Sequence, residues 1–400
     1  MPTTPPEPYA VGSPPRRGSP TDRCPGAIRL FEASDGWLAR IRLGGRSLGP
    51  SQAAGIASLA MELGDGHVDL TSRASLQLRG LAGTDGEPLA DALTDLGLLP
   101  SATHERARNI VSAPFGDASV EECAAALDRA LCADPDLARL SGRFLFRVDD
   151  GSGQLDDLPA DISVTPTVNA VEQAISAARA FLELAETLDP TPWQVRDLDA
   201  ASAARLRARL RERLRPGLDE PGRRDGDVAS HPDVVVFPQD RSRTPGPAGD
   251  RPLGLVTGRD ATTFVHVLAP LGRVPAHVWR LAGATPARLR VTPWRGVVLA
   301  GLDRRAAELA LDTLVAAGWI GDARHPLARH TACTGSPGCS RSRSDVRADA
   351  LRLAPVLTDR SGPVHWSGCE RRCGHPGGPH VDRLATGPAR YATTPSKDTM

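Results

Sequence analysis

The stretch HTACTGSPGCSRS (residues 330–342) is followed by HWSGCERRCGHP (residues 365–376), and the two together decide the fold of the last quarter of the chain. They hold four of the seven cysteines, as two pairs: Cys333 with Cys339, then Cys369 with Cys373. Glycine, serine and proline surround each pair. Because such residues let sulfur atoms and backbone amides approach a bulky inorganic group, the two stretches predict a metal centre.

Three kinds of site can use four cysteines. Four thiolates suit a 4Fe-4S cluster. They also suit a structural zinc ion, but zinc sites usually separate the cysteines of a pair by two to four residues, whereas five residues separate the first pair here. Two disulfides or four unrelated thiols would leave their grouping at one end of the chain unexplained. The spacing therefore favours the cluster and leaves the other two possibilities open.

The composition argues against several classes of function. The chain has 48 basic and 48 acidic residues, so no net field would attract a nucleic acid. Aromatic residues make up only 4% of it, which leaves few platforms for stacking bases. The N-terminal residues lack the apolar run of a secretory signal, and no later stretch reaches the roughly 18 apolar residues of a membrane span. We expect a soluble, cytoplasmic protein without nucleic-acid or membrane partners.

With 400 residues, the chain is expected to form two to four domains. Residues 1–22 are rich in Pro, Ser and Gly and predict a disordered tail. Residues 23–100 predict one unit from the spacing of their apolar residues. Its expected elements are a strand at 37–43, a helix at 51–63, a strand at 67–81 with a kink at 72–74, and a helix at 88–96.

The same order of elements recurs in residues 251–322. When residues 67–81 are laid on residues 288–302 without a gap, Thr71, Leu78, Gly80 and Leu81 meet identical residues. The order of elements and these identities together predict an internal duplication.

The remaining segments differ in character. Residues 101–215 predict an α/β unit with helices at 120–131, 168–188 and 201–215 and a strand within 142–151. The last of these helices presents arginines on a solvated face. The other expected segments are a linker at 216–250 with a short strand at Val234–Phe237, a cluster-binding domain at 323–385 and a loose tail at 386–400.

The cysteine pattern, five residues within one pair and three within the other, resembles the 4Fe-4S signature of the sulfite and nitrite reductase superfamily. Within it, TACTGSPGC and VHWSGCERRCGHP are most similar to the precorrin-3B synthase family. The resemblance implies an α+β fold, in which duplicated ferredoxin-like half-domains with pseudo-twofold symmetry accompany sulfite-reductase-like α/β cluster-binding domains. It also implies a 4Fe-4S cluster on the four cysteines.

The resemblance further implies an oxygen-dependent monooxygenase of aerobic cobalamin (vitamin B12) biosynthesis. Such an enzyme converts precorrin-3A to precorrin-3B by hydroxylating a meso carbon and closing a lactone. Its partners would be the tetrapyrrole, dioxygen and an external electron donor, either an NADH-linked reductase or a ferredoxin. A mononuclear non-haem iron is a further possible cofactor, and His330, His365, His375 and His380 flank the cysteine loops without a spacing that selects its ligands.

A substrate with many carboxylates needs several arginines that converge on one cavity, because each guanidinium can hold a carboxylate with two parallel hydrogen bonds. Each arginine considered singly is more often a solvated surface residue, and Arg40 is a further candidate. The resemblance places substrate contacts on motifs RIRLGG, TSRASLQ, RNIVSAP and SGRFLFR, through Arg42, Arg73, Gln77, Arg108, Asn109 and Arg143. Cys24, in RCPG, is expected near the same pocket.

Two other functions stay open. A sirohaem-dependent nitrite or sulfite reductase would use Cys373 to bridge cluster and haem. Reductase relatives carry a second lysine where this chain has Leu145, which counts against that function. The second alternative is a non-catalytic tetrapyrrole-binding metalloprotein.

Overall fold

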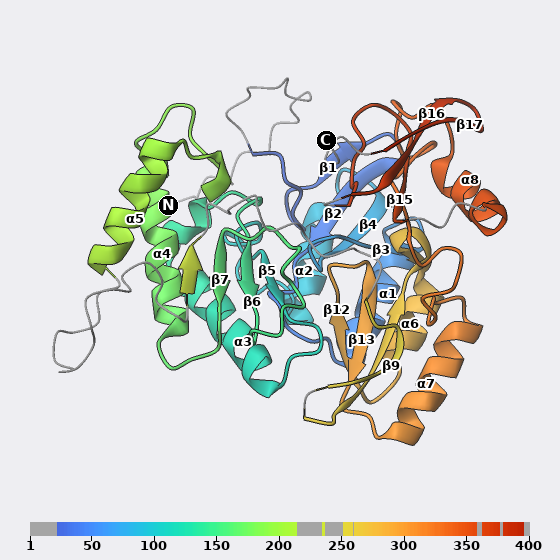
Figure 1. Cartoon of the computed structure of the whole chain (residues 1–400), viewed down its shortest axis with the longest axis horizontal. Coiled ribbons are helices and arrows are strands. Elements are labelled where there is room, and N and C mark those ends of the chain that lie inside the picture. Colours follow the sequence, from blue (N-terminus) through green and yellow to red (C-terminus); the bar gives the residue numbers. More distant parts are fainter. Residues whose placement is uncertain are drawn as a thin grey trace, which may run out of the picture.

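The computed structural model describes residues 22–213, 234–236, 251–258, 260–357, 362–376 and 379–395. The expected tail at 1–22, apart from Asp22, lies outside the described residues, as does most of the expected linker at 216–250. The described strands form four sheets (Figure 1). No helix in these ranges combines the length and apolar character that crossing a bilayer requires.

The first sheet belongs to the first half-domain. Its cross-strand pairs Ile41–Leu76 and Ala39–Leu78 are buried beneath two helices, while Arg40 and Gln77 form a pair on the opposite face. This alternation explains why the segment forms strands. The elements are β1 (Phe31–Ala33), β2 (Gly36–Ile41), α1 (Pro50–Glu62), β3 (His67–Leu70), β4 (Leu76–Leu81) and α2 (Gly86–Asp95).

Two details differ from expectation. Residues 67–81 form two antiparallel strands instead of one kinked strand, because Thr71 N donates to Ser75 O at 3.0 Å and Ala74 has a φ of 48°, which closes a turn. The first helix begins at Pro50, after Gly49, because proline fits the first turn of a helix. The other elements lie close to their predicted positions.

The second half-domain repeats the first. Thr292 N donates to Gly296 O at 2.9 Å, as Thr71 does to Ser75, and Arg295 has a φ of 60° where the first copy has Ala74. The predicted duplication is therefore present in the backbone. Its elements are β9 (Gly254–Thr257), β10 (Thr263–Leu268), β11 (Arg273–Pro275), α6 (Ala276–Gly283), β12 (Arg288–Val291), β13 (Gly296–Ala300) and α7 (Arg304–Ala316).

The half-domains exchange backbone pairing about a pseudo-twofold axis. β11 of the second copy pairs with β3 of the first, and Leu48 of the first copy bridges to Leu289 of the second. Helices α1 and α6 pack so closely that a Cβ on Gly283 would lie 2.2 Å from the Cβ of Ala53. The two copies therefore form one structural unit.

The middle α/β unit lies to one side, with α4 and α5 at its outer edge (Figure 1). Strands β5, β6 and β7 are parallel, and β8 from the expected linker adds an antiparallel edge strand. Phe144, Phe146 and Phe181 pack together in its core. Its elements are β5 (Ile110–Ser112), α3 (Ala118–Ala133), β6 (Phe146–Val148), β7 (Ile162–Val164), α4 (Ala170–Ala185), α5 (Ala200–Arg213) and β8 (Val234–Val236).

The cysteine-bearing unit, which we call the cysteine module, is a four-stranded sheet with one helix. Residues 386–395 of the expected loose tail at 386–400 are instead ordered in an antiparallel hairpin of β16 and β17, and the rest of that tail lies outside the described residues. Its elements are β14 (His330–Ala332), α8 (Val346–Leu353), β15 (Val364–Ser367), β16 (Val381–Gly387) and β17 (Arg390–Pro395). A short 3-10 turn, Ala354–Val356, follows α8 in this module, and others in the chain span Pro135–Arg139, Val195–Asp197 and Pro270–Gly272.

Candidate functional site

The two cysteine loops lie side by side because they follow neighbouring parallel strands. Ala332 and Trp366 are paired in the register of β14 and β15, so the loops begin at the same sheet edge. Cys333 N donates to Trp366 O at 2.9 Å, and Gly368 N donates to Cys333 Sγ at 3.2 Å. The carboxyl ends of parallel strands thus bring sequence-distant thiols together.

The four thiols share one electrostatic environment. Burial raises the pKa of Cys333, and the charges of Cys339 and Cys369 add to the rise. Burial also raises the pKa of Cys373, and the other three cysteines contribute. Four thiols that repel one another as thiolates need a positively charged group to ionise together, which is the environment that iron ions provide.

The arrangement of these thiols bears on which metal group they could hold. Among the described residues, which include all four cysteines, no three His, Cys, Asp or Glu side chains are grouped as the ligands of a single ion. A zinc ion gathers its ligands around one point, whereas a 4Fe-4S cube receives each thiolate at a different iron atom. Four thiol donors and the amide that faces Cys333 Sγ are compatible with a 4Fe-4S cluster, and the choice between a cluster and zinc stays a prediction.

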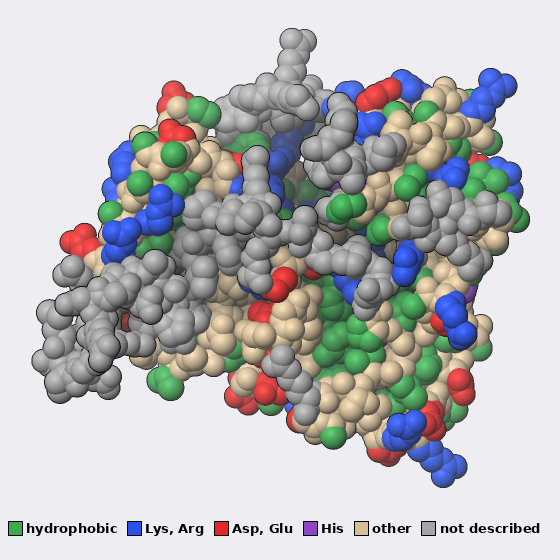
Figure 2. All heavy atoms as spheres, viewed as in Figure 1, with side chains coloured by type: hydrophobic (Ala, Val, Ile, Leu, Met, Phe, Trp, Pro, Cys, Tyr) green, Lys and Arg blue, Asp and Glu red, His purple; other side chains and the backbone are tan. Residues whose placement is uncertain are grey.

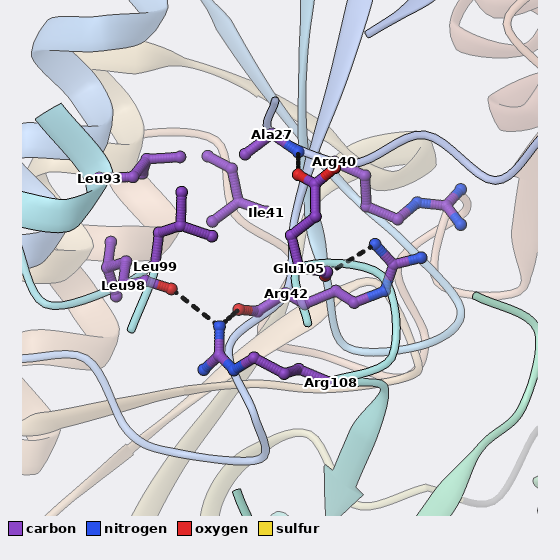
Figure 3. Close-up of a pocket in the computed structure, with 9 residues that line it drawn as sticks. All are labelled: Ala27, Arg40, Ile41, Arg42, Leu93, Leu98, Leu99, Glu105 and Arg108. Carbon is purple, nitrogen blue, oxygen red and sulfur yellow. Dashed lines mark hydrogen bonds between the residues drawn. The ribbon is translucent and has the colours of Figure 1, made fainter. Parts of the chain in front are cut away.

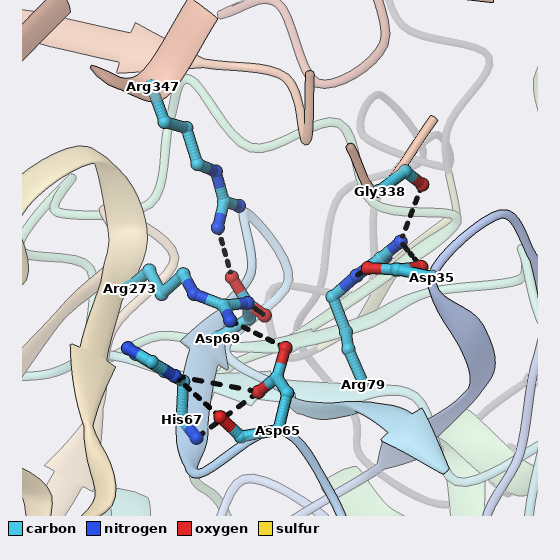
Figure 4. A network of polar contacts seen from close by, with 8 residues as sticks. All are labelled: Asp35, Asp65, His67, Asp69, Arg79, Arg273, Gly338 and Arg347. Carbon is cyan, nitrogen blue, oxygen red and sulfur yellow. Dashed lines mark hydrogen bonds and ion pairs between the residues drawn. The ribbon is translucent and has the colours of Figure 1, made fainter. Parts of the chain in front are cut away.

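A polar network fastens the cysteine module to the first sheet (Figure 4). Arg79 of β4 forms a two-pronged ion pair with Asp35, at 2.9 and 2.7 Å, and also donates to Gly338 O at 3.2 Å. On the same side, Arg347 of α8 pairs with Asp69 of β3 at 2.9 Å. The face of the sheet opposite its helices is therefore the face that meets the cysteine module.

The same face carries the predicted arginines. With its amide oxygen turned toward Arg40, Gln77 accepts from Arg40 Nε at 3.1 Å and from Nη2 at 2.7 Å. Arg73, in the turn before β4, donates to Arg143 O at 3.1 Å. Arg143 is exposed and stacks on the ring of Trp193, 4.5 Å from its centroid.

Arg40, Arg73, Arg143 and Arg196 form a set that we call the arginine site, and Arg196 was not predicted. It lies close enough to Arg73 to lower the pKa of that group, after the larger effect of burial. Its segment, WQVR at 193–196, has no spacing that would have revealed it. Figure 2 shows Lys and Arg side chains in the hollow between the lobe of α4 and α5 and the lobe of β15 to β17.

The arginine site is short of negative charge. Burial, and to a smaller extent Arg73, lowers the pKa of Arg40, while burial followed by Arg40 lowers the pKa of Arg42 to about 9. Cys24 lies among these groups, and burial followed by Asp22 raises its pKa. Guanidinium groups that repel one another are stabilised by an anionic ligand, so the site is suited to a polycarboxylate.

Asp161 organises the outer part of the site. Its carboxyl accepts from Leu145 N at 2.8 Å and from Val195 N at 2.7 Å, which joins the segments that carry Arg143 and Arg196. Burial raises the pKa of Asp161 to about 6 despite these hydrogen bonds. Sequence reasoning missed this residue because its partners are backbone amides.

Arg108 does not belong to the ligand surface, and its prediction as a substrate contact is wrong. It is 1% exposed, and Asp128 accepts from its Nε and Nη2 at 2.7 Å each. Arg42, also predicted as a substrate contact, is 3% exposed and donates to Pro25 O at 3.0 Å, so it lies beneath the arginine site and does not face a ligand. In Figure 3 the guanidinium groups of Arg40 and Arg42 lie on one side of a water-sized cavity of about 10 Å³, and that of Arg108 lies on the other.

Asn109 is likewise internal instead of ligand-facing. It is 2% exposed, and its Nδ2 donates to Phe144 O at 3.0 Å. In the RN pair of RNIVSAP, Arg108 therefore links the middle unit to the first half-domain through Leu98 O, while Asn109 makes a contact within the middle unit. The prediction of substrate contacts from this motif needs correction for both residues.

Of the four histidines near the cysteine loops, His330 has separate surroundings, whereas His365, His375 and His380 lie near one another. His330 accepts from Trp366 Nε1 at 2.9 Å, and burial lowers its pKa to about 4. His365 is buried and lies 2.8 Å from Thr331 Oγ1. His375 stacks on His380 with ring centroids 5.7 Å apart. They do not form a three-ligand ion site within the described residues.

Among the described residues of the second half-domain, no equivalent arginine site is found. His266 and Val298 occupy the cross-strand pair that corresponds to Arg40 and Gln77, and Trp294 corresponds to Arg73. Phe115 packs on both His266 and Trp294, with centroids 5.5 and 6.0 Å away. Aromatic rings thus fill the face that arginines line in the first copy.

Comparisons with known proteins agree with this architecture. Residues 32–96 match the model of the nitrite/sulfite reductase ferredoxin-like half domain. The chain is 25% identical over 389 residues to a precorrin-3B synthase from Sinorhizobium sp, covering 90% of this chain and 79% of that relative. The Mycobacterium tuberculosis NirA structure aligns with a TM-score of 0.63 at 17% identity, covering 89% of this chain and 73% of that one.

These similarities confirm three predictions. The chain resembles precorrin-3B synthase and the nitrite/sulfite reductase group, its fold class is α+β with ferredoxin-like half-domains, and it is an enzyme of the oxidoreductase type.

Proposed function

We propose that this chain is a precorrin-3B synthase, an oxygen-dependent monooxygenase that converts precorrin-3A to precorrin-3B in the cytoplasm. One observation carries the proposal: the arginine site and the four cysteines lie on the same face of the first sheet, with Arg79 between them. A polycarboxylate ring and an electron source have to meet in such an enzyme. Similarity to a precorrin-3B synthase over 90% of the chain supports the choice of substrate.

The cysteines would hold a 4Fe-4S cluster, which supplies electrons singly from an external donor. Arg40, Arg73, Arg143 and Arg196 would bind the acetate and propionate groups of the tetrapyrrole. A hydrogen bond to a charged group contributes about 1.5–3 kcal/mol, so three or four such contacts account for firm binding. Trp193, under Arg143, adds an apolar surface for the edge of the ring.

The proposed reaction requires an external reductant as the source of its electrons. One atom of dioxygen enters a meso carbon as hydroxyl and the other leaves as water, which consumes two electrons and two protons from the donor. A ring acetate then closes the lactone. The role of the chain is to orient the macrocycle through its carboxylates and to exclude water. The proposal assigns no ligands to a mononuclear iron.

The runner-up is a sirohaem-dependent nitrite or sulfite reductase, which the likeness of fold to NirA keeps in view. Leu145, which is buried, stands in place of the second lysine expected for a small reducible anion. The absorption spectrum of the isolated protein separates the two: sirohaem bands would remove the synthase, and cluster absorption without haem agrees with it.

The deciding experiment uses the whole chain purified without oxygen. Iron and sulfide analysis should give about four of each per chain; zinc in their place would reduce the protein to a non-catalytic tetrapyrrole-binding metalloprotein. Precorrin-3A, a reductant and labelled dioxygen are then added, and the product is weighed. One labelled oxygen atom in the macrocycle is the expected result, and an unlabelled macrocycle overturns the proposal.

A further inference from the structure

The turn that presents Arg73 occurs twice in this chain, and its second copy carries a different arginine. In the first copy Thr71 and Ser75 close the turn, and in the second Thr292 and Gly296 do so with the same hydrogen bond. Arg295 has a backbone φ of 60°, a positive value that residues other than glycine rarely adopt. Such a conformation in a non-glycine residue marks a position held by its surroundings.

The side chain of Arg295 reaches the cysteine module. Its Nη2 donates to Gly374 O at 2.7 Å, and Gly374 directly follows Cys373. Glycine is needed at two positions along its path: a Cβ on Gly272 would lie 2.5 Å from Arg295 Cδ, and one on Gly374 would lie 3.2 Å from Nη2. The guanidinium is therefore fitted against the loop that carries the last cysteine.

The charge of Arg295 is uncompensated within the described part of the chain. No Asp or Glu there forms an ion pair with it, whereas its charged neighbour Arg347 is paired with Asp69 at 2.9 Å. Burial, followed by repulsion from Arg347, lowers the pKa of Arg295 to about 10. The group thus stays protonated at neutral pH and needs a negative neighbour.

We propose that Arg295 is a positioning residue that holds the Cys373 loop and places a positive charge beside the iron–sulfur cluster, raising the reduction potential of that cluster. The inference rests on the proposed function, because it requires the cluster. Reduction adds a negative charge to a centre that four thiolates already make anionic, and a nearby guanidinium stabilises the reduced form more than the oxidised one. The duplicated turn would then serve the substrate in one copy and the cluster in the other.

The test is a redox titration of the cluster, followed by electron paramagnetic resonance, in the parent chain and three variants. Arg295→Gln removes the charge and keeps a donor, and Arg295→Lys keeps the charge. Arg304→Gln is the control, because that arginine is exposed on α7 and pairs with Glu308. We expect a lower potential for R295Q, a potential near that of the parent for R295K, and no shift for R304Q. An R295Q potential equal to that of the parent overturns the inference.

A further variant keeps the test decisive if R295Q fails to bind iron. Arg295→His bears a charge only when its imidazole is protonated, so its potential should fall, relative to the parent, as pH rises through the histidine range. The comparison with the parent accounts for His365, His375 and His380, which are present in both. A pH dependence identical to that of the parent contradicts the inference. Absence of iron and sulfide from the parent itself would count against the proposed function instead.

Discussion

At the scale of single residues, burial separates arginines that the motifs treated alike. Arg73 is partly exposed, so its guanidinium can donate hydrogen bonds to a ligand. The guanidinium of Arg108 donates to Asp128 and to Leu98 O inside the protein. A buried pair of this kind is costly to break, because removing one partner leaves the other charged and desolvated. The two residues should therefore respond to substitution in opposite ways.

Replacing Arg108 should damage the fold. Arg108→Met leaves buried Asp128 with only the longer 3.6 Å contact to Arg46, and we expect the free energy of unfolding to fall by about 3–5 kcal/mol. Urea denaturation measures it. The double variant Arg108→Met with Asp128→Leu should recover much of the loss, since the arginine that then loses Asp128, Arg46, is partly exposed and keeps its hydrogen bond to Gly97 O. A double variant as unstable as the single one would contradict this account.

Replacing Arg73 should damage binding instead. Arg73→Gln removes one charge-assisted contact, worth about 1.5–3 kcal/mol, so the Kd for precorrin-3A should rise roughly 10- to 100-fold. Calorimetric titration without oxygen measures the Kd, and thermal unfolding should stay close to that of the parent. Arg280→Gln, an exposed arginine that contacts Ser58, serves as the matched control and should leave the Kd unchanged.

Buried His266 should make the protein sensitive to acid. Burial lowers its pKa to about 4 from the usual 6.5. The unfolded chain then binds more protons between those two pKa values, so stability is complete above pH 6.5 and falls as pH drops toward 4. The loss amounts to about 3 kcal/mol at 1.36 kcal/mol per pH unit.

His266→Phe, which suits an aromatic surrounding, should flatten the dependence of unfolding free energy on pH in this window. His277→Gln changes an exposed histidine and should keep the slope of the parent. Equal slopes in the parent and in H266F would show that another group controls the acid response.

At the scale of elements, the cysteine loops depend on how closely two strand ends can approach. Gly368 follows β15, and a Cβ there would lie 1.9 Å from Ser342 Oγ in the other loop. The amide of Gly368 also faces Cys333 Sγ. The spacing of the thiols is therefore set by contact between two loops.

Gly368→Ala should push the loops apart and lower the iron and sulfide content of protein purified without oxygen, while far-ultraviolet circular dichroism stays the same. Gly362→Ala is the matched control, because a Cβ on Gly362 meets nothing within 4 Å. Full cluster content in G368A would mean that the loops can adjust, and that the close contact between Gly368 and Ser342 is not required for cluster binding.

At the scale of the whole molecule, the cysteine module is held to the first half-domain by a few polar contacts. Arg79 is 6% exposed and links Asp35 of one unit with Gly338 of the other. Removing it leaves that carboxylate and that carbonyl without their shared donor. The relative position of the cysteine module and the arginine site thus depends on contacts such as those of Arg79 with Gly338 and of Arg347 with Asp69.

Arg79→Met should loosen this contact without unfolding the chain. Loss of hydrogen bonds to a charged group costs about 2 kcal/mol, which corresponds to roughly 30-fold faster local opening. Hydrogen exchange of residues 334–342, read by mass spectrometry, should accelerate, while exchange in α4 stays unchanged. Arg352→Met, which removes an exposed arginine paired with the largely buried Asp349, should leave both regions as they are. Unaltered exchange in R79M would contradict the docking role.

The sequence by itself determined what depends on local order. Apolar periodicity located most helices and strands, and the recurrence at residues 67–81 and 288–302 revealed the duplication, because alternation and turn chemistry act between near neighbours. The spacing of Cys333, Cys339, Cys369 and Cys373 identified the resemblance to the reductase superfamily.

Only the tertiary structure decided the fate of each charged side chain. Whether an arginine binds a ligand or an internal carboxylate depends on which distant segment covers it, as Asp128 covers Arg108. Sequence reasoning did not identify the roles of Arg79, Arg196 and Arg295 for the same reason. Their partners are backbone atoms and side chains that folding brings near. Electrostatic energy depends on distance in space and on burial, not on separation along the chain.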